Sequence, residues 1–429
     1  MNKKLMLIFY FALLSGIEAQ TWQVFTNGDL GIPETSITAL AEDKEGIIWA
    51  GTANGILKYD GTNWEKFDTT NTPLAVQFIW TITVDSFNNK WFGTFADTAG
   101  LIKYDNQNWT VYNVKDYGLN GSAVFSIAID SNNNLWMGTY WDGLAMFDTG
   151  NLWKVYNHTN SGLLQPQEEI NCVVIDDSNH LWYGSDGWGA GSFDLDSTWE
   201  YFTNFTVIDP VVFSISIDGR NNKWFGGVES VSMFIPDSGW RKFDYSNEGE
   251  WYYSMVTDTN KSVWFASTKK GLLKLDYSQG EKWIHVFPPG YPVLQNEGCG
   301  TLIKDKTGNL WIGYNNGYIA VFNPGGIVSV KNKNGIVPTT YQLYQNYPNP
   351  FNPTTEIKYQ IKEPGFVSLK VFDILGKEVA TLVDEHKNPG HYSVTFDASS
   401  VSGGLPSGVY IYKLQAGEFS SVKKMLLTK

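Results

Sequence analysis

Seven segments of the chain repeat one order of apolar and polar positions, and each contains an aspartate followed six residues later by a tryptophan. The position three before each aspartate is aliphatic or methionine and the position four before it is small, as Leu40 and Ala39 illustrate. Such alternation predicts a strand with one crowded face. Successive tryptophans lie 40 to 47 residues apart, which indicates one supersecondary unit per repeat. The seven pairs are Asp43–Trp49, Asp85–Trp91, Asp130–Trp136, Asp176–Trp182, Asp218–Trp224, Asp258–Trp264 and Asp305–Trp311.

Each unit is expected to form four short strands. The aspartate opens a turn, because Gly or Asn follows three residues later in six of the seven units, as a turn with positive φ requires. The tryptophan strand comes next, then a strand such as 143–147, and finally a strand that begins with a second tryptophan, as in 153–156. Four strands per repeat of this length are typical of a β-propeller blade.

The last unit lacks its fourth strand after Phe322, but residues 22–25 resemble residues 64–67, the fourth strand of the first unit. An N-terminal strand in that place would close the ring and remove an exposed sheet edge. We therefore expect an all-β protein with a seven-bladed β-propeller over residues 20–326, closed by the N-terminal strand.

The amino-acid composition and the pattern of apolar positions change after residue 326. All 18 tryptophans precede residue 312. The runs 323–326 (Asn-Pro-Gly-Gly) and 331–335 (Lys-Asn-Lys-Asn-Gly) have the composition of a linker, which we expect over residues 327–343. Residues 344–429 contain short alternating runs separated by Gly and Pro turns, which favours a small C-terminal Ig-like β-sandwich.

The first 19 residues have the pattern of a secretory signal. Lys3 and Lys4 precede an apolar run from Leu5 to Leu14, and a cleavage site follows Ala19. We expect a signal peptide over residues 1–19, with a buried N-terminal segment as the alternative. No later apolar run approaches the length of about 20 residues that crosses a bilayer, so we expect no transmembrane segment.

Charge excludes one class of partner. The chain has 31 basic and 44 acidic residues, and its only arginines are Arg220 and Arg241. Neutralising a phosphate backbone requires clustered Lys and Arg. We therefore expect no nucleic-acid partner.

The side chains considered for catalysis or metal binding occupy positions that the repeat itself explains. The seven aspartates share one turn position, so we expect them to cap the turn backbone. His158 and His180 fall in turns on opposite faces, and neither a nucleophile elbow nor a phosphate loop is present. Cys172 and Cys299 fall in distant blades, so we expect two free thiols. We expect no cofactor, no bound metal and no catalytic residue.

The run from Asp130 to Leu144 resembles the propeller repeats of two-component regulators, and this likeness extends over about residues 20–326. The C-terminal residues look like the C-terminal sorting domain of type IX secretion cargo. That resemblance implies that type IX secretion machinery carries the protein through the periplasm to the outer-membrane surface or the extracellular space. It further implies removal of the domain, followed by anchoring or release. The motif residues are Tyr347, Pro348, Asn349, Pro350, Phe351, Asn352, Pro353, Gly408, Tyr410, Lys423 and Lys424.

Aromatic residues outside the repeat are the candidates for ligand binding. Exposed rings stack on sugars or anchor protein partners, although rings at blade ends can also simply cover the core. We expect Trp80, which aligns with Phe125, to belong to the core. The remaining candidates fall in second turns or in the loop entering unit six, all on one rim: Trp141, Trp188, Trp251, Tyr140 and Phe95.

These observations predict a secreted or cell-surface protein that binds a glycan or a surface protein without catalysis. Only 18 to 23 residues separate each fourth-strand tryptophan from the next aspartate, so no blade has a long loop for a catalytic pocket. Two alternatives stay open. One is a scaffold without a small ligand, and the other is an extracellular carbohydrate hydrolase or lyase using the rim carboxylates Glu168, Glu169, Asp209 or Glu250.

Overall fold

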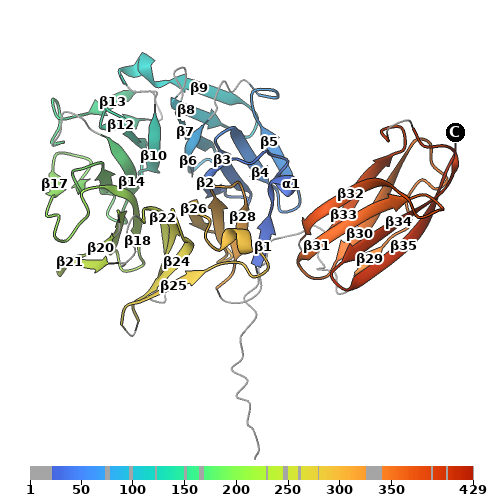
Figure 1. Cartoon of the computed structure of the whole chain (residues 1–429). Helices are drawn as coiled ribbons and strands as arrows, with labels where there is room; N and C mark the ends of the chain where they lie inside the picture. The colour runs from blue at the N-terminus through green and yellow to red at the C-terminus, as the bar shows by residue number, and fades with distance from the viewer. Residues whose placement is uncertain are drawn as a thin grey trace, which may run out of the picture.

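The computed structural model describes residues 22–72, 78–95, 100–120, 123–148, 152–163, 169–228, 230–244, 250–258, 262–278, 280–324, 341–387, 390–401 and 404–428. Seven four-stranded antiparallel sheets surround a common axis, and a second, smaller β unit lies beside this ring (Figure 1). The expected signal peptide and residues 327–340 of the expected linker lie outside the described residues.

The first four blades follow one another along the chain. Blade one consists of β2 (Ile37–Glu42), β3 (Ile48–Thr52), β4 (Gly55–Tyr59) and β5 (Trp64–Phe67). Blade two consists of β6 (Ile79–Val84), β7 (Lys90–Thr94), β8 (Gly100–Tyr104) and β9 (Trp109–Asn113). Blade three consists of β10 (Val124–Ile129), β11 (Leu135–Thr139), β12 (Leu144–Phe147) and β13 (Trp153–Tyr156). Blade four consists of β14 (Ile170–Ile175), β15 (Leu181–Ser185), β16 (Ala190–Phe193) and β17 (Trp199–Phe202).

The remaining blades complete the ring. Blade five consists of β18 (Val212–Ile217), β19 (Lys223–Gly227), β20 (Ser230–Ile235) and β21 (Gly239–Asp244). Blade six consists of β22 (Tyr252–Asp258), β23 (Ser262–Ser267), β24 (Gly271–Asp276) and β25 (Lys282–Val286). Blade seven consists of β26 (Cys299–Lys304), β27 (Leu310–Tyr314), β28 (Ile319–Phe322) and β1 (Trp22–Phe25). The short helical segments are α1 (Asn27–Leu30), η1 (Val114–Tyr117) and η2 (Pro292–Leu294).

The N-terminal strand closes the ring, as predicted. β1 pairs antiparallel with β28, with Trp22 opposite Phe322 and Val24 opposite Ala320. The two strands lie side by side in Figure 1, blue against gold, although about 300 residues of chain separate them. The innermost strands also contact one another around the whole ring, in the pairs β2–β6, β6–β10, β10–β14, β14–β18, β18–β22, β22–β26 and β26–β2.

The repeated aspartates cap their turns and also hold the repeated tryptophans. In blade one, Oδ1 of Asp43 accepts hydrogen bonds from the backbone amides of Glu45 and Ile47, and Oδ2 accepts one from Nε1 of Trp49. The same indole-to-carboxylate bond occurs in six blades at 2.8 to 3.2 Å. The six-residue spacing therefore reflects this hydrogen bond, because a buried indole N–H and a buried carboxylate each need a partner.

The aspartate Oδ2 also has a second donor, which comes from one of two sources. In blades two, three, five and seven it is the side-chain amide of an asparagine four residues after the aspartate: Asn89, Asn134, Asn222 and Asn309. Blades one and four have Ile47 and His180 at that position, and there a lysine from the following blade reaches back. Lys90 pairs with Asp43, and Lys223 pairs with Asp176, both at 3.0 Å and almost fully buried.

These two lysines also lie over the rings of the tryptophans that they flank, Lys90 at 5.2 Å from the Trp49 centroid and Lys223 at 4.8 Å from that of Trp182. Burial by itself raises the pKa of Asp43, but the hydrogen bonds from Trp49 and Lys90 outweigh it, and the net shift is downward. Each lysine therefore stabilises an ionised carboxylate across a blade boundary.

The C-terminal unit is a β-sandwich of two sheets. One sheet contains β29 (Gln342–Leu343), β30 (Thr354–Ile361) and β33 (Gly390–Asp397). The other contains β32 (Glu378–Lys387), β31 (Gly365–Phe372), β34 (Gly408–Ala416) and β35 (Phe419–Leu427) in that order. Their facing sides enclose one hydrophobic core that includes Ile357, Leu369 and Tyr412.

The end of β32 meets the propeller. Lys387 forms ion pairs with Asp29 of α1 at 3.3 Å and with its own neighbour Glu385 at 2.8 Å, and the His386 ring lies 5.4 Å from the ring of Tyr291. The sandwich thus rests beside the segments that carry the chain out of blade six and into blade one (Figure 1).

Candidate functional site

The two faces of the propeller differ in what they carry. One face, here called the Asp face, bears the aspartate turns between the first and second strands of each blade. The other, here called the loop face, bears the turns between the second and third strands together with the connections between blades. Backbone hydrogen bonds join these two kinds of segment, as in Phe95 N–H to Phe78 O at 3.2 Å and Tyr140 N–H to Ala123 O at 3.2 Å. The described segments of the loop face therefore form a rim around the channel.

Every blade has a β-bulge where its innermost strand approaches this rim. In blade one, Ile37 pairs with Thr52 and Ala39 pairs with Gly51, so Thr38 is left out of the ladder. The same shift occurs in the other six blades. A bulge frees one residue from pairing and redirects its side chain. The seven bulged residues are Thr38, Trp80, Phe125, Asn171, Phe213, Tyr253 and Gly300, and all of them line the channel cavity.

The cavity has a volume of about 510 Å³ and is lined from the innermost strands of all seven blades. That volume lies within the range of small-molecule sites. The bulged positions carry four aromatic side chains, two polar ones and a glycine, whereas the flanking positions are aliphatic or small in nearly every blade. The variable positions of the repeat thus gather at one opening.

The rings form two groups on different sides of the opening. On blades two and three, Trp80 lies 4.6 Å from Phe78 and 5.3 Å from Phe125. On blades five and six, Phe213 stacks on Trp251 at 5.4 Å and meets Tyr253 edge-on at 4.9 Å. These are the centroid separations of favourable aromatic pairs.

Between the two aromatic groups the rim is polar or open. Asn171 and Glu169 of blade four lie on one side, where the Asn171 amide donates to Val212 O at 3.3 Å. Thr38 and Gly300, with Asn315 beside them, lie on the other side. A ligand in the opening would therefore meet flat apolar faces in two directions and polar groups in between.

Three of the five predicted rim aromatics are connected to this opening through ring contacts. Trp251 stacks on Phe213, Tyr140 meets Phe125 edge-on at 5.6 Å, and Trp141 meets Tyr140 at 4.7 Å. Trp188 and Phe95 are exposed on the same face, but no described ring contacts either of them. The assignment of these residues to ligand binding stays a prediction.

The expectation that Trp80 belongs to the core is wrong. Its side chain is 39% exposed and lines the cavity. In a regular strand Trp80 would share the face of Ile82, which packs between blades, but the bulge after Ile79 turns it toward the channel. The equivalent positions Phe125, Phe213 and Tyr253 were missed as site residues for the same reason. A signal was available in the sequence, because the residue type at this inner-strand position varies widely between repeats, whereas the positions on either side of it are aliphatic or small in nearly every blade.

The carboxylates of the enzyme alternative do not converge. Glu168 lies outside the described residues. Asp209 accepts hydrogen bonds from Val211 N–H at 3.1 Å and the Ser230 hydroxyl at 3.2 Å, and Glu250 is fully buried and accepts one from the Ser267 hydroxyl. Glu169 alone among the described acids lines the cavity. Glycoside hydrolysis generally requires two carboxyl groups across the scissile bond.

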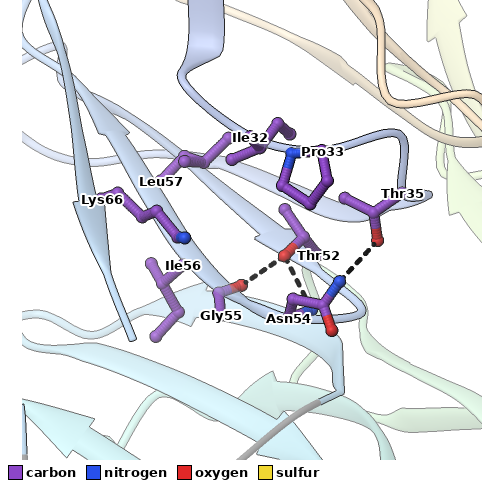
Figure 2. A pocket seen from close by; sticks show the side chains of 9 residues that line it. All are labelled: Ile32, Pro33, Thr35, Thr52, Asn54, Gly55, Ile56, Leu57 and Lys66. Carbon is purple, nitrogen blue, oxygen red and sulfur yellow. Dashed lines mark hydrogen bonds between the residues drawn. The ribbon is translucent and has the colours of Figure 1, made fainter. Parts of the chain in front are cut away.

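A much smaller hollow of about 60 Å³ lies near the loop face of blade one, where Lys66 faces the turn of Asn54 (Figure 2). The Asn54 amide closes it by donating to the Thr35 hydroxyl at 3.3 Å, and Lys66 is ion-paired with Asp68 at 2.8 Å. This hollow has room for only a few water molecules, so we do not assign it a ligand.

Cys172 and Cys299 are both buried and unbridged, as predicted. Cys172 lines the cavity, and burial raises the pKa of its thiol far above the usual value, so the thiol is inert. The described residues contain no group of three or more potential metal-ligating side chains. None of the described helices is long and apolar enough to cross a membrane.

The sorting motif combines residues from the first and the last segments of the sandwich sequence, and contacts within the fold bring them together. The Phe351 side chain is buried in the core, and its backbone N–H donates to Leu426 O at 2.9 Å. Leu426 N–H in turn donates to the Asn349 side chain at 2.8 Å, which fixes the segment 347–353 against the end of β35. The Tyr410 hydroxyl donates to Pro406 O at 2.9 Å, and Lys423 and Lys424 lie on β35.

Comparisons with known proteins agree with this architecture. A family model described as secretion system C-terminal sorting domain matches residues 345–428, and one described as two component regulator propeller matches residues 31–54 and 118–141. No curated protein matches the sequence.

Solved structures share the fold at low sequence identity. The extracellular domain assigned to a one component system of B. thetaiotaomicron has a TM-score of 0.60 at 14% identity, over 96% of this chain and 59% of that one. One assigned to a hybrid two component system of B. thetaiotaomicron has a TM-score of 0.58 at 16% identity, over 96% of this chain and 58% of that one. The chain thus spans less than two thirds of these two structures.

An enzyme also has a similar fold. A catalytically inactive His-to-Ala variant of virginiamycin B lyase from Staphylococcus aureus, solved with quinupristin, has a TM-score of 0.59 at 12% identity, over 71% of this chain and 99% of that one. Similarity at this level shows a shared fold and does not decide between sensing and catalysis. The chain therefore carries two component regulator propeller repeats followed by a type IX secretion system C-terminal sorting domain, which directs it to the cell surface or the extracellular space.

Proposed function

We propose that the protein is a non-enzymatic surface module that binds a glycan at the aromatic opening of its propeller channel. The observation that carries this proposal is the set of bulged residues, which places Trp80, Phe125, Phe213 and Tyr253 around one cavity. The apolar face of a pyranose ring stacks on an aromatic face, while its hydroxyl groups bond neutral polar side chains such as Asn171.

Binding without turnover is favoured by what the cavity contains. Its described lining has one carboxylate, Glu169, and no histidine. Acid–base cleavage of a glycosidic bond generally requires two carboxyl groups in defined positions. An activity test with Glu169→Gln as the control separates the two functions, and glycan turnover that disappears in this variant would contradict the proposal.

A glycan array probed with the full chain tests the binding function. We expect the wild type to retain specific glycans, and a Trp80→Ala/Phe213→Ala variant, which removes one ring from each aromatic group, to lose them. Central aromatic residues of a binding site contribute at least about a tenfold change in affinity each. Phe87→Ala is the matched control, because Phe87 is exposed on the Asp face, away from the cavity.

The outcomes separate clearly. Failure of the wild type to bind any glycan contradicts the function. Glycan binding that survives in the Trp80/Phe213 variant contradicts the location. Circular dichroism and thermal unfolding of the variants establish that lost binding does not come from lost folding.

A further inference from the structure

The charge of the cavity is carried by a single side chain. Glu169 is the one charged residue among its described lining residues, and no Lys, Arg or His is present there. No described residue donates a hydrogen bond to the Glu169 carboxylate or forms an ion pair with it. Its backbone carbonyl accepts the Asp186 amide at 3.0 Å, which fixes the position of the residue on the rim.

None of the described lining residues neutralises the negative charge of the Glu169 carboxylate. Glu169 is half-buried at the blade-four side of the opening, and the other described lining residues are aromatic, aliphatic or neutral polar. Burial raises its pKa, and the neighbouring carboxylate of Asp186 raises it further. Ionised carboxylates in such places are stabilised by a cation.

We propose that the opening selects glycans that carry a free amino group, with Glu169 as the residue that determines this specificity. The inference rests on the proposed function, and it names the class of sugar. A protonated amine can pair with the carboxylate, and charge-assisted hydrogen bonds are about twice as strong as neutral ones.

The aromatic groups favour the same ligand. Tyr253 and Trp80 line the opening and are exposed there, and a cation near the face of an aromatic ring is attracted by its quadrupole. An acidic sugar would instead bring a second negative charge next to Glu169 with no described lining residue to neutralise it. The opening therefore favours amino sugars in two ways: Glu169 attracts their ammonium group, and it repels the carboxylate of an acidic sugar.

The experiment compares three oligosaccharides of equal length by calorimetry with the full chain: oligoglucosamine, its N-acetylated form and oligogalacturonate. We expect the amine-bearing probe to bind about tenfold or more tightly than the N-acetylated one, and the uronate to bind most weakly. Glu169→Gln should bring the amine-bearing and N-acetylated probes to similar affinity. Glu297→Gln, a half-buried carboxylate on the loop face outside the cavity lining, is the matched control.

The dependence on pH provides a second readout. Affinity for the amine-bearing probe should rise with pH as Glu169 ionises and fall again as the amine loses its proton, whereas the N-acetylated probe should give a flat profile. Asp186→Asn should move the rising limb to lower pH, because it removes a charge that raises the pKa of Glu169. The other titratable lining residues are Tyr253 and Cys172, whose pKa values are raised by burial, so they stay protonated throughout.

Each result decides something different. Equal affinity of the wild type for all three probes, or unchanged selectivity in Glu169→Gln, overturns the role of Glu169 while glycan binding stands. Absence of binding to these probes and to every glycan of the array contradicts the proposed function itself.

Discussion

The buried pair between Lys90 and Asp43 allows a test in which the protein supplies its own control. Lys90→Met removes the ammonium and keeps most of the side-chain volume. The Asp43 carboxylate, which is fully buried, would then retain its hydrogen bonds from Glu45, Ile47 and Trp49 but lose its counterion. Removing one partner of a buried ion pair costs about 3–5 kcal/mol. We expect a value near the lower end, about 3 kcal/mol, because three hydrogen bonds persist.

Ile47→Asn should reverse part of this loss. In blade two, Asn89 occupies the equivalent position and its amide donates to Asp85 Oδ2 at 2.7 Å. Both Ile47 and Asn89 are half-buried, so the exchange requires no new cavity. A hydrogen bond to a charged group contributes about 1.5–3 kcal/mol. The double variant Ile47→Asn/Lys90→Met should therefore recover half or more of the lost stability.

Urea unfolding of the full chain, followed by tryptophan fluorescence at neutral pH, measures these differences as shifts of the transition midpoint. Lys103→Met is the matched control, because Lys103 lies 5.3 Å from the Trp91 centroid without a described ion pair to the repeat aspartate, and it should lose only about 1 kcal/mol. Equal losses in the two lysine variants, or no recovery with Ile47→Asn, would refute the reasoning.

The same pair predicts how the loss depends on pH. The folded pKa of Asp43 lies below its unfolded value of about 3.9, so the pair stabilises the protein above that pH and its contribution disappears as the pH falls through the folded pKa. Without Lys90, the pKa of Asp43 should be higher than in the wild type, because the hydrogen bond and the charge of Lys90 both lower it. The difference between wild type and Lys90→Met should therefore be largest at neutral pH and shrink below about pH 4.

Three further predictions concern packing, closure and the domain contact. Gly138→Val should destabilise the propeller by at least about 2 kcal/mol in urea unfolding, because a Cβ there would lie 2.5 Å from the carbonyl oxygen of Ile170 in the next blade. Val24→Asp should open the ring at β1, because it buries an unpaired charge, and limited proteolysis should then cleave blade seven. Asp29→Asn should loosen the sandwich from the propeller, detectable as a larger radius of gyration. Burial alone lowers the pKa of Lys387, but Asp29 and Glu385 raise it overall, so the wild-type contact should persist below the usual lysine pKa and weaken as pH rises through the folded value.

The periodic pattern alone was enough to predict the ring. Each repeat encodes four strands, and the place of residues 22–25 follows from the strand that the seventh repeat lacks. The sorting domain could be recognised for a similar reason, because its motif residues occur in order along the chain. Local patterns of this kind are readable because hydrophobic alternation and turn chemistry act between near neighbours.

Tertiary structure decided the contacts that depend on register and on neighbouring blades. No local pattern shows that Trp80 faces the channel, because a bulge is a mismatch with the partner strand and only that partner reveals it. The reach of Lys90 to Asp43, 47 residues earlier, likewise depends on how one blade stacks on the next. The opening, its two aromatic groups and the isolated Glu169 exist only after seven similar strands meet around one axis, where each repeat contributes its bulged residue to the same cavity.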